Sequence, residues 1–269
     1  MFPTRNAVVP VLSALLSVPG ALAAENMAVY NGALGGVPHD SPCWEYVTNA
    51  NFTAPTNVNG ATTLGPTTNG GRALWVQSLV PFSFADGASI TASVKIISSS
   101  YYASNPYRRS GYYLTLVDKN SKLFQIGISS DRVLLHTADQ NWSDQTYLFN
   151  TTDAFHTYKL DVQGTTARVY IDGNLVLTDT LSSYTPSSDS QVSFGDTSTL
   201  ANSNSLTAWV VVEGIPDCTA GDLNCDGIVD GTDLGILLGA WNTDACAADL
   251  NHDLIVDGSD LGILLGNWG

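Results

Sequence analysis

Two hydrophobic patterns divide the chain. Between residues 25 and 214, apolar and polar residues alternate in short runs that are separated by clusters of Gly, Ser, Asn and Asp. This period of two predicts β-strands, and no stretch of the region shows a helical period. The clearest runs are Ile90–Ile96, Tyr112–Val117, Phe124–Ile128, Val133–His136, Tyr158–Val162, Ala167–Ile171 and Ala208–Val212. About 190 residues of this pattern predict a mainly β fold, a two-sheet sandwich with a core large enough to fold alone.

Near the C-terminus the period becomes helical. Leu234, Leu237, Leu238 and Trp241 stand at i, i+3, i+4 and i+7, and the pattern returns 27 residues later at Leu261, Leu264, Leu265 and Trp268. Each set predicts a short helix with one apolar stripe.

Both predicted helices also carry glycines at i and i+4: Gly235 and Gly239, then Gly262 and Gly266. Each glycine costs roughly 1 kcal/mol relative to Ala, so a closely approaching backbone would explain them. That backbone belongs either to the sister helix or to a partner protein. The sister helix is our expectation, because a small module needs tight helix packing.

A loop rich in carboxylates precedes each predicted helix. Oxygen side chains fall at positions 1, 3, 5, 9 and 12, which is the ligand spacing of an EF-hand-type calcium loop, and position 7 contributes only its backbone carbonyl. The first loop has Asp222, Asn224, Asp226, Ile228, Asp230 and Asp233, and the second has Asp249, Asn251, Asp253, Ile255, Asp257 and Asp260.

Charge repulsion favours a cation in these loops. At an effective dielectric of ~20, two like charges ~4 Å apart cost about 4 kcal/mol. A divalent cation removes that cost, and calcium prefers many hard oxygen ligands. We therefore predict two Ca²⁺ ions as cofactors. The alternative is an acidic, solvated turn that recurs.

Two calcium loops, each followed by one helix, resemble a type I dockerin module over residues 216–269, with repeats at 222–241 and 249–268. The resemblance implies that calcium-ordered helices dock on a cohesin of a scaffold or cell-surface protein. The resemblance also implies that the two residues just ahead of position 12 in each loop determine which partner a dockerin binds. Here these candidate partner-binding residues are Gly231, Thr232, Gly258 and Ser259.

The repeat departs from the standard loop at two positions. Leu254 replaces the position-6 glycine that Gly227 supplies in the first loop, which predicts a weaker or strained second site. Position 12 is Asp rather than the Glu of a standard EF-hand, and Asp at this position is usual for dockerins.

One stretch of the β region carries a second resemblance. Phe155–Val162 followed by Ala167–Asn174 resembles the paired strands of concanavalin A-like lectin/glucanase sandwiches, laminin-G-like modules included. Phe194–Asp196 and the final strand through Val212 fit the same jelly roll. The resemblance implies a jelly-roll sandwich over residues 24–215, an architecture that hosts lectins, hydrolases, lyases and inert spacers. Asp172-Gly173 predicts a hairpin turn.

Aromatic and planar polar side chains in two loops favour carbohydrate binding, because sugar rings stack on aromatic faces. The candidate residues are Tyr101, Tyr102, Tyr107, Arg108 and Trp142. The alternative is that Tyr101 and Tyr102 finish a strand and that Trp142 caps the core.

Evidence for catalysis is weaker. Hydrolytic members of the resembled superfamily place a nucleophile and an acid/base ~5 Å apart in a Glu-x-Asp-x-x-Glu motif. This chain has only Glu25, Glu45 and Glu213 and no such motif, so no catalytic residue is assigned and we lean against an enzyme. Catalysis by Asp pairs, or by Tyr and His as in some lyases, stays open; Tyr112, His136, His156 and Arg168 are available.

The N-terminus predicts export. Met1 to Ala23 has Arg5, then an interrupted apolar run, then Ala21-Leu22-Ala23, which is typical of a secretory signal cleaved near Ala23–Ala24. The run is too short to span a membrane, so we expect a soluble extracellular protein. Four cysteines are consistent with an oxidising compartment. Cys218 and Cys246 precede the two loops at nearly equivalent places, and we expect them to pair, although three connectivities are possible.

Acidic charge is concentrated in the repeat. The net charge is -15, and residues 217–269 contain ten Asp but no Glu, Lys or Arg. Such a surface argues against nucleic acid or an anionic membrane as partner. Two bound calcium ions would neutralise roughly four of these charges.

Three functions therefore compete. The first is a non-catalytic carbohydrate-binding or adhesion protein anchored through its dockerin in a polysaccharide-degrading system. The second is a glycoside hydrolase or polysaccharide lyase of the same fold. The third is a structural component that binds cohesin and no sugar.

Overall fold

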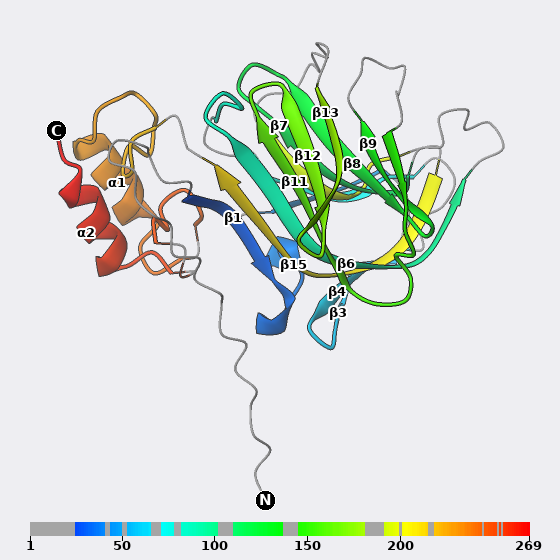
Figure 1. Ribbon diagram of the computed structural model, residues 1–269. Helices are drawn as coiled ribbons and strands as arrows, with labels where there is room; N and C mark the ends of the chain where they lie inside the picture. The colour runs from blue at the N-terminus through cyan, green and yellow to red at the C-terminus, as the bar shows by residue number, and fades with distance from the viewer. Residues whose placement is uncertain are drawn as a thin grey trace, which may run out of the picture.

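The structure is a computed structural model in which a β-sandwich is followed by a small helical module (Figure 1). It describes residues 25–40, 44–49, 53–65, 71–77, 82–101, 110–136, 145–180, 191–198, 201–214, 218–243, 245–251, 253 and 255–269. The expected signal segment and its cleavage point lie outside these residues. No helix among them is long and apolar enough to cross a bilayer.

The first sheet has eight antiparallel strands in the order β13-β12-β11-β6-β15-β4-β3, with β1 also paired to β15. Its strands are β1 (Glu25–Asn31), β3 (Asn57–Val58), β4 (Ala61–Leu64), β6 (Ala88–Tyr101), β11 (His156–Gln163), β12 (Thr166–Ile171), β13 (Asn174–Thr180) and β15 (Ala201–Gly214). Two short 3-10 turns, η1 (Gly32–Leu34) and η2 (Pro38–Asp40), follow β1.

The second sheet has seven strands in the order β10-β9-β8-β7-β14-β5-β2, all antiparallel. They are β2 (Glu45–Thr48), β5 (Ala73–Gln77), β7 (Tyr112–Val117), β8 (Leu123–Ser129), β9 (Arg132–His136), β10 (Gln145–Leu148) and β14 (Gln191–Asp196). All seven runs named from the sequence are strands, and the prediction of a two-sheet sandwich is confirmed.

The core lies between the sheets and is built by alternation. Inward residues of β6 and β11, such as Ile90 and Leu160, are fully buried, and along β11 the residues of the other face are polar and partly exposed. The predicted Asp172-Gly173 turn joins β12 to β13, and both residues hold positive φ, 50° and 80°, as a tight hairpin requires. Strand β7 instead is buried along its whole length, so the second sheet is covered on both faces at this central strand, while its edge strands β10 and β2 are largely exposed.

Two nine-residue helices form the C-terminal module: α1 (Gly231–Gly239) and α2 (Gly258–Gly266). Asp230 and Asp257 are their N-caps, and Asp233 and Asp260 complete a capping box in each. A separate small core holds the helices together, made of the repeat-related pairs Val229 and Val256, Leu237 and Leu264, together with Ala248.

The apolar stripe predicted for each helix is divided in the structure. Leu237 and Leu264 are fully buried, whereas Leu238 and Leu265 are each 51% exposed. The reason is that each short helix packs against its sister along one narrow line. In each helix the first two residues of the stripe lie on that line, and the last two, a leucine and a tryptophan, do not.

The glycine pairs do not lie against the sister helix. A Cβ added at Gly235, Gly239, Gly262 or Gly266 would meet no atom within 4 Å outside the helix's own backbone. Our expectation of a close helix–helix approach at these positions is therefore wrong, because the contact between the helices runs through leucine side chains on the other face.

Candidate functional site

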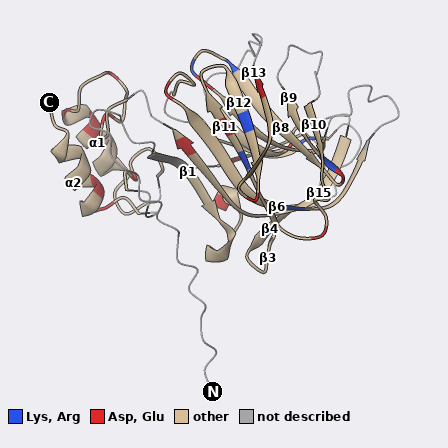
Figure 2. Ribbon diagram, viewed as in Figure 1, with Lys and Arg blue, Asp and Glu red and all other residues tan. Residues whose placement is uncertain are grey.

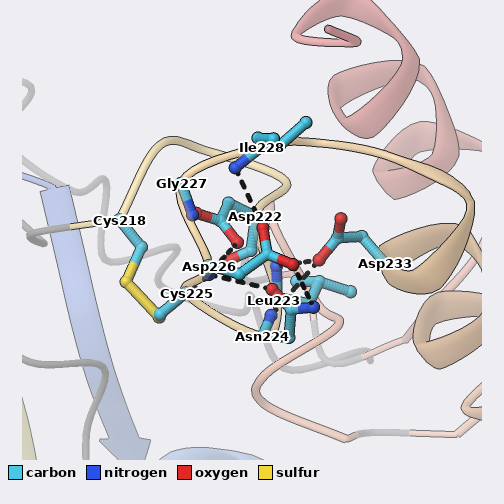
Figure 3. Close-up of a disulfide and its surroundings, with 9 residues drawn as sticks. All are labelled: Cys218, Asp222, Leu223, Asn224, Cys225, Asp226, Gly227, Ile228 and Asp233. Carbon is cyan, nitrogen blue, oxygen red and sulfur yellow. Dashed lines mark hydrogen bonds between the residues drawn. A yellow bond between two sulfur atoms is a disulfide. The ribbon is translucent and has the colours of Figure 1, made fainter.

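The first acidic loop winds around two buried carboxylates (Figure 3). Asp222 accepts the N–H of Asp226 on Oδ1 at 3.1 Å and that of Gly227 on Oδ2 at 2.9 Å. Asp233 accepts the N–H of Leu223 on Oδ1 at 2.8 Å and that of Asp230 on Oδ2 at 2.8 Å. These bonds tie positions 1 and 12 to the backbone between them and give the loop its tight turn.

The second loop repeats this arrangement. Asp249 Oδ1 accepts the N–H of Asp253 at 3.1 Å, and Asp260 accepts those of Leu250 and Asp257, both at 2.7 Å. Each bond has its counterpart 27 residues earlier. The two repeats also exchange reciprocal bonds, because Asn242 N–H donates to Val256 O and Gly269 N–H donates to Val229 O.

Negative charge is buried in both loops without a basic side chain nearby in sequence. Four carboxylates are at most 4% exposed: those of Asp222, Asp233, Asp249 and Asp260. Residues 217–269 contain no Lys or Arg. In Figure 2, α1 and α2 accordingly show acidic residues in red and no basic residues in blue. Burial on its own raises the pKa of Asp233. The N–H groups of Asp230, Asn224 and Leu223 outweigh it and bring that pKa below its usual value.

The chemistry of the donor set fits calcium. Every side-chain ligand position carries a carboxylate or amide oxygen, and the carboxylates at positions 1 and 12 are buried. Within the part of the chain that the structure describes, no three His, Cys, Asp or Glu side chains form a ready-made metal cluster. The oxygens of Asn224, Asp226 and Asp230, which are not buried, would have to gather around an ion.

The disulfide we expected between Cys218 and Cys246 is wrong. Cys218 is bonded to Cys225, with Cα atoms 5.2 Å apart, because the loop turns back at position 4 where Cys225 holds φ 58°. Cys246 is also disulfide-bonded, and the remaining cysteine of the chain, Cys43, lies outside the described residues. A shift of 27 residues places Ala245, not Cys246, at the position equivalent to Cys218.

Large apolar side chains are exposed at the same places in both repeats. Ile228 and Ile255 are 55% and 40% exposed, and Trp241 and Trp268 are 42% and 48% exposed. Together with Leu238 and Leu265 they form what we call the repeat apolar surface. The predicted partner-binding residues Gly231, Thr232, Gly258 and Ser259 are also exposed, in the first turn of each helix.

Most of the predicted carbohydrate-binding residues cannot be placed. Tyr101 is the last residue of β6, and Tyr102, Tyr107, Arg108 and Trp142 lie outside the described residues. The prediction that they bind sugar therefore remains a prediction.

A row of polar side chains across the second sheet was missed from the sequence. The strand register aligns Ser193, Thr115, Gln125 and His136 on the face turned away from the core, each at most 8% exposed. Gln125 Nε2 donates to Thr115 Oγ1 at 3.3 Å. The available signal was one polar residue inside each otherwise apolar strand, but only the register shows that these residues are neighbours.

The residues we considered for catalysis are dispersed. Tyr112 is fully buried, its hydroxyl bonds Thr207 Oγ1 at 2.8 Å, and burial raises its pKa far above the usual value. Arg168 pairs with Asp161 at 3.4 Å on the first sheet, whereas His136 lies on the second. Glu45 and Glu213 also belong to different sheets.

His156, the first residue of β11, lies between two carboxylates. Its Nδ1 is 2.7 Å from Asp172 Oδ2 and its Nε2 is 3.0 Å from Asp153 Oδ1. Partial burial on its own lowers the pKa of His156, but the two carboxylates outweigh it and raise that pKa. Conversely, hydrogen bonding to His156 lowers the pKa of Asp153. The pKa of Asp172 is also lowered, because the N–H of Thr157 and His156 outweigh burial.

This cluster should stabilise the sandwich over a limited pH range. The histidine contribution is present below its unfolded pKa of about 6.5 and is lost as the pH rises through the higher folded value. The carboxylate contribution is present above about pH 4 and is lost as the pH falls. We expect His156→Gln to lower the melting temperature most between about pH 4 and 6.5. Arg168→Gln serves as the control, and a His156→Gln deficit that is constant from pH 4 to 9 would contradict the assignment.

No protein-family model matches this chain, and no curated protein does either. Among solved structures, a carbohydrate esterase from the Shiga toxin-encoding bacteriophage phi24B is 14% identical, with 71% of this chain and 99% of that chain covered and a TM-score of 0.48. The Crh5 transglycosylase in complex with NAG is 13% identical, over 73% and 89% of the two chains, with a TM-score of 0.49. An endo-beta-1,3-glucanase from Pyrococcus furiosus is 12% identical, over 71% and 94%, with a TM-score of 0.46.

Proposed function

We propose that this chain is an exported protein in which a calcium-dependent docking module anchors a carbohydrate-binding β-sandwich. One observation carries the docking half: two acidic loops share the same backbone bonds to buried carboxylates and are followed by helices that expose the same apolar residues. Metal binding can supply the folding energy that so small a module lacks, and the same candidate ligands, caps and exposed residues recur in both repeats.

Calcium would be held in each loop by the oxygens of positions 1, 3, 5, 9 and 12 and the carbonyl of position 7. Bound there, the ion neutralises the carboxylates and links the loop to the first turn of its helix. The protein's own part is to orient the ligands, because Asp233 and Asp260 also belong to the capping boxes that start α1 and α2. Calorimetry with the intact chain should give two Ca²⁺ per molecule, and a chain that binds none would overturn the proposal.

The repeat apolar surface would contact the partner, which by its resemblance is a cohesin-type scaffold or cell-surface protein. Exposed glycines on the same helices leave room for a second backbone, which accounts for residues that intramolecular packing does not explain.

Truncating this surface should separate binding from folding. Leu238→Ala combined with Leu265→Ala should change stability by less than about 0.5 kcal/mol, because both side chains are half exposed. Retention on a cohesin affinity column should fall at least about tenfold. Leu148→Ala, a 75% exposed residue of the sandwich, is the matched control. Unchanged retention would remove this surface from the proposal.

For the sandwich we propose polysaccharide binding. Support comes from the two-sheet fold itself, built with the β11–β12–β13 strands on which the resemblance rests. A glycan array probed with the intact chain, read beside a reducing-end assay, tests it. Binding without product supports the proposal, product release indicates a hydrolase or lyase, and no binding favours a structural role.

Export is supported by cysteine chemistry. Cys218, Cys225 and Cys246 are all disulfide-bonded. Such bonds persist outside the reducing cytosol, which agrees with the secretory signal expected from the sequence. Recovery of the chain from culture medium, lacking its first residues, is the direct measurement.

A further inference from the structure

The two acidic loops have the same candidate ligands but differ in their cysteines. Cys218, four residues ahead of the first loop, is bonded to Cys225 at loop position 4. The equivalent positions of the second loop are Ala245 and His252, which cannot form this bond. The first loop is therefore closed on itself by a disulfide, whereas the second loop has no cysteine at either of these two positions.

The disulfide ring encloses residues that organise the first ligand. Asp222 lies inside the ring, and its carboxylate binds the N–H groups of Asp226 and Gly227 just beyond it (Figure 3). Gly221 lies inside the ring too and abuts α2, since a Cβ there would come 3.0 Å from the Cα of Leu264. The ring thus fixes the entrance of the loop against the sister helix.

The backbone conformation of Cys225 is one that the first loop would not keep easily without the disulfide. Cys225 holds φ 58°, in the left-handed region that residues with a Cβ disfavour. Without the disulfide, the metal-free loop would leave this conformation readily, and calcium would have to restore it on binding. The first loop also has Gly227 at position 6, with φ 94°, where the second loop has leucine.

We propose that the Cys218–Cys225 disulfide preorganises the first loop as the tighter of two calcium sites, and that its reduction by a dithiol weakens calcium binding there. The inference rests on the proposed calcium function. Closing the ring removes conformational freedom from the metal-free loop, so less of it is lost when the ion binds.

The bond is open to such a reductant. Cys225 is exposed and Cys218 is half-buried. One thiolate of the dithiol attacks a sulfur to form a mixed disulfide, and its second thiolate displaces the protein. The dithiol is oxidised to a cyclic disulfide. Its two electrons and two protons pass to the protein, where Cys218 and Cys225 become thiols.

Calcium calorimetry on the intact chain tests the proposal one loop at a time. Asp253→Asn disables the second loop and Asp226→Asn the first, and each is made with and without the pair Cys218→Ser and Cys225→Ser. With the first loop active, removing the disulfide should raise Kd about tenfold. With the second loop active, the same change should leave Kd within about twofold. Equal effects on both loops, or no effect on the first, would overturn the proposal.

A second measurement covers variants that fold poorly. In the wild-type chain without calcium, the amides of Asp226 and Gly227 should exchange more slowly with the disulfide closed than with it open, so that reduction by dithiothreitol, followed by thiol labelling, should speed their exchange about tenfold. Unchanged exchange after labelling of both cysteines would overturn the proposal. A wild-type chain that binds no calcium defeats the proposed function instead, whereas two bound ions with no sensitivity to reduction defeat this inference alone.

Discussion

Removing calcium from the intact chain should release both C-terminal helices while the sandwich stays folded. The module has only a small core of Val229, Val256, Leu237, Leu264 and Ala248, too little to hold two nine-residue helices against buried negative charge. Binding to the folded state alone, with free calcium at about a hundred times Kd, stabilises by about 2.7 kcal/mol. Chelation withdraws that contribution.

Amide exchange measured by mass spectrometry checks this expectation locally. Peptides covering α1 and α2 should exchange about a hundredfold faster in chelator than in calcium, while peptides of β7 and β11 should not change. Helices that exchange equally slowly in both conditions would show that the metal does not order the module.

Asp233→Asn should reproduce much of the chelation effect in calcium. The substitution removes one anionic oxygen from a side chain that accepts three backbone N–H groups and completes the capping box of α1. The bond from Gly269 to Val229 transmits the disturbance to the second repeat. Asp86→Asn, on an exposed sandwich residue, is the control and should leave exchange unchanged.

Phe194→Ala should cost the sandwich about 3–5 kcal/mol of unfolding free energy. Phe194 is fully buried in β14, and its ring lies 4.9 Å from that of Trp44 and 5.1 Å from that of Trp75. Truncation leaves a cavity among large rigid rings that cannot collapse into it. Urea unfolding followed by tryptophan fluorescence measures the loss.

Phe155→Ala is the matched control for this change. Phe155 is 42% exposed, so removing its ring should cost less than about 1 kcal/mol. Similar losses for the two variants would mean that the aromatic cluster around Phe194 is not part of the cooperative core.

Local pattern was enough to identify the elements with strong periodicity. The alternation in Tyr112–Val117 and Ala167–Ile171 predicted strands β7 and β12, and Asp172-Gly173 predicted the hairpin between β12 and β13. The strands β2, β3, β4 and β10 were not recognised because each has four residues or fewer, too few for a period. The longer strands β1 and β5 were also missed.

The positions of the acidic loops and their helices could be read from the sequence alone, since the spacing of the oxygen side chains and the helix caps involve residues no more than twelve positions apart. Only the tertiary structure decided that Cys218 bonds Cys225, that Leu237 turns inward while Leu238 faces out, and that Thr115, Gln125 and His136 share one face. The disulfide depends on how the first loop turns back at position 4, and the other two facts depend on the narrow contact between the helices and on strand register. Such contacts join residues that no local pattern relates.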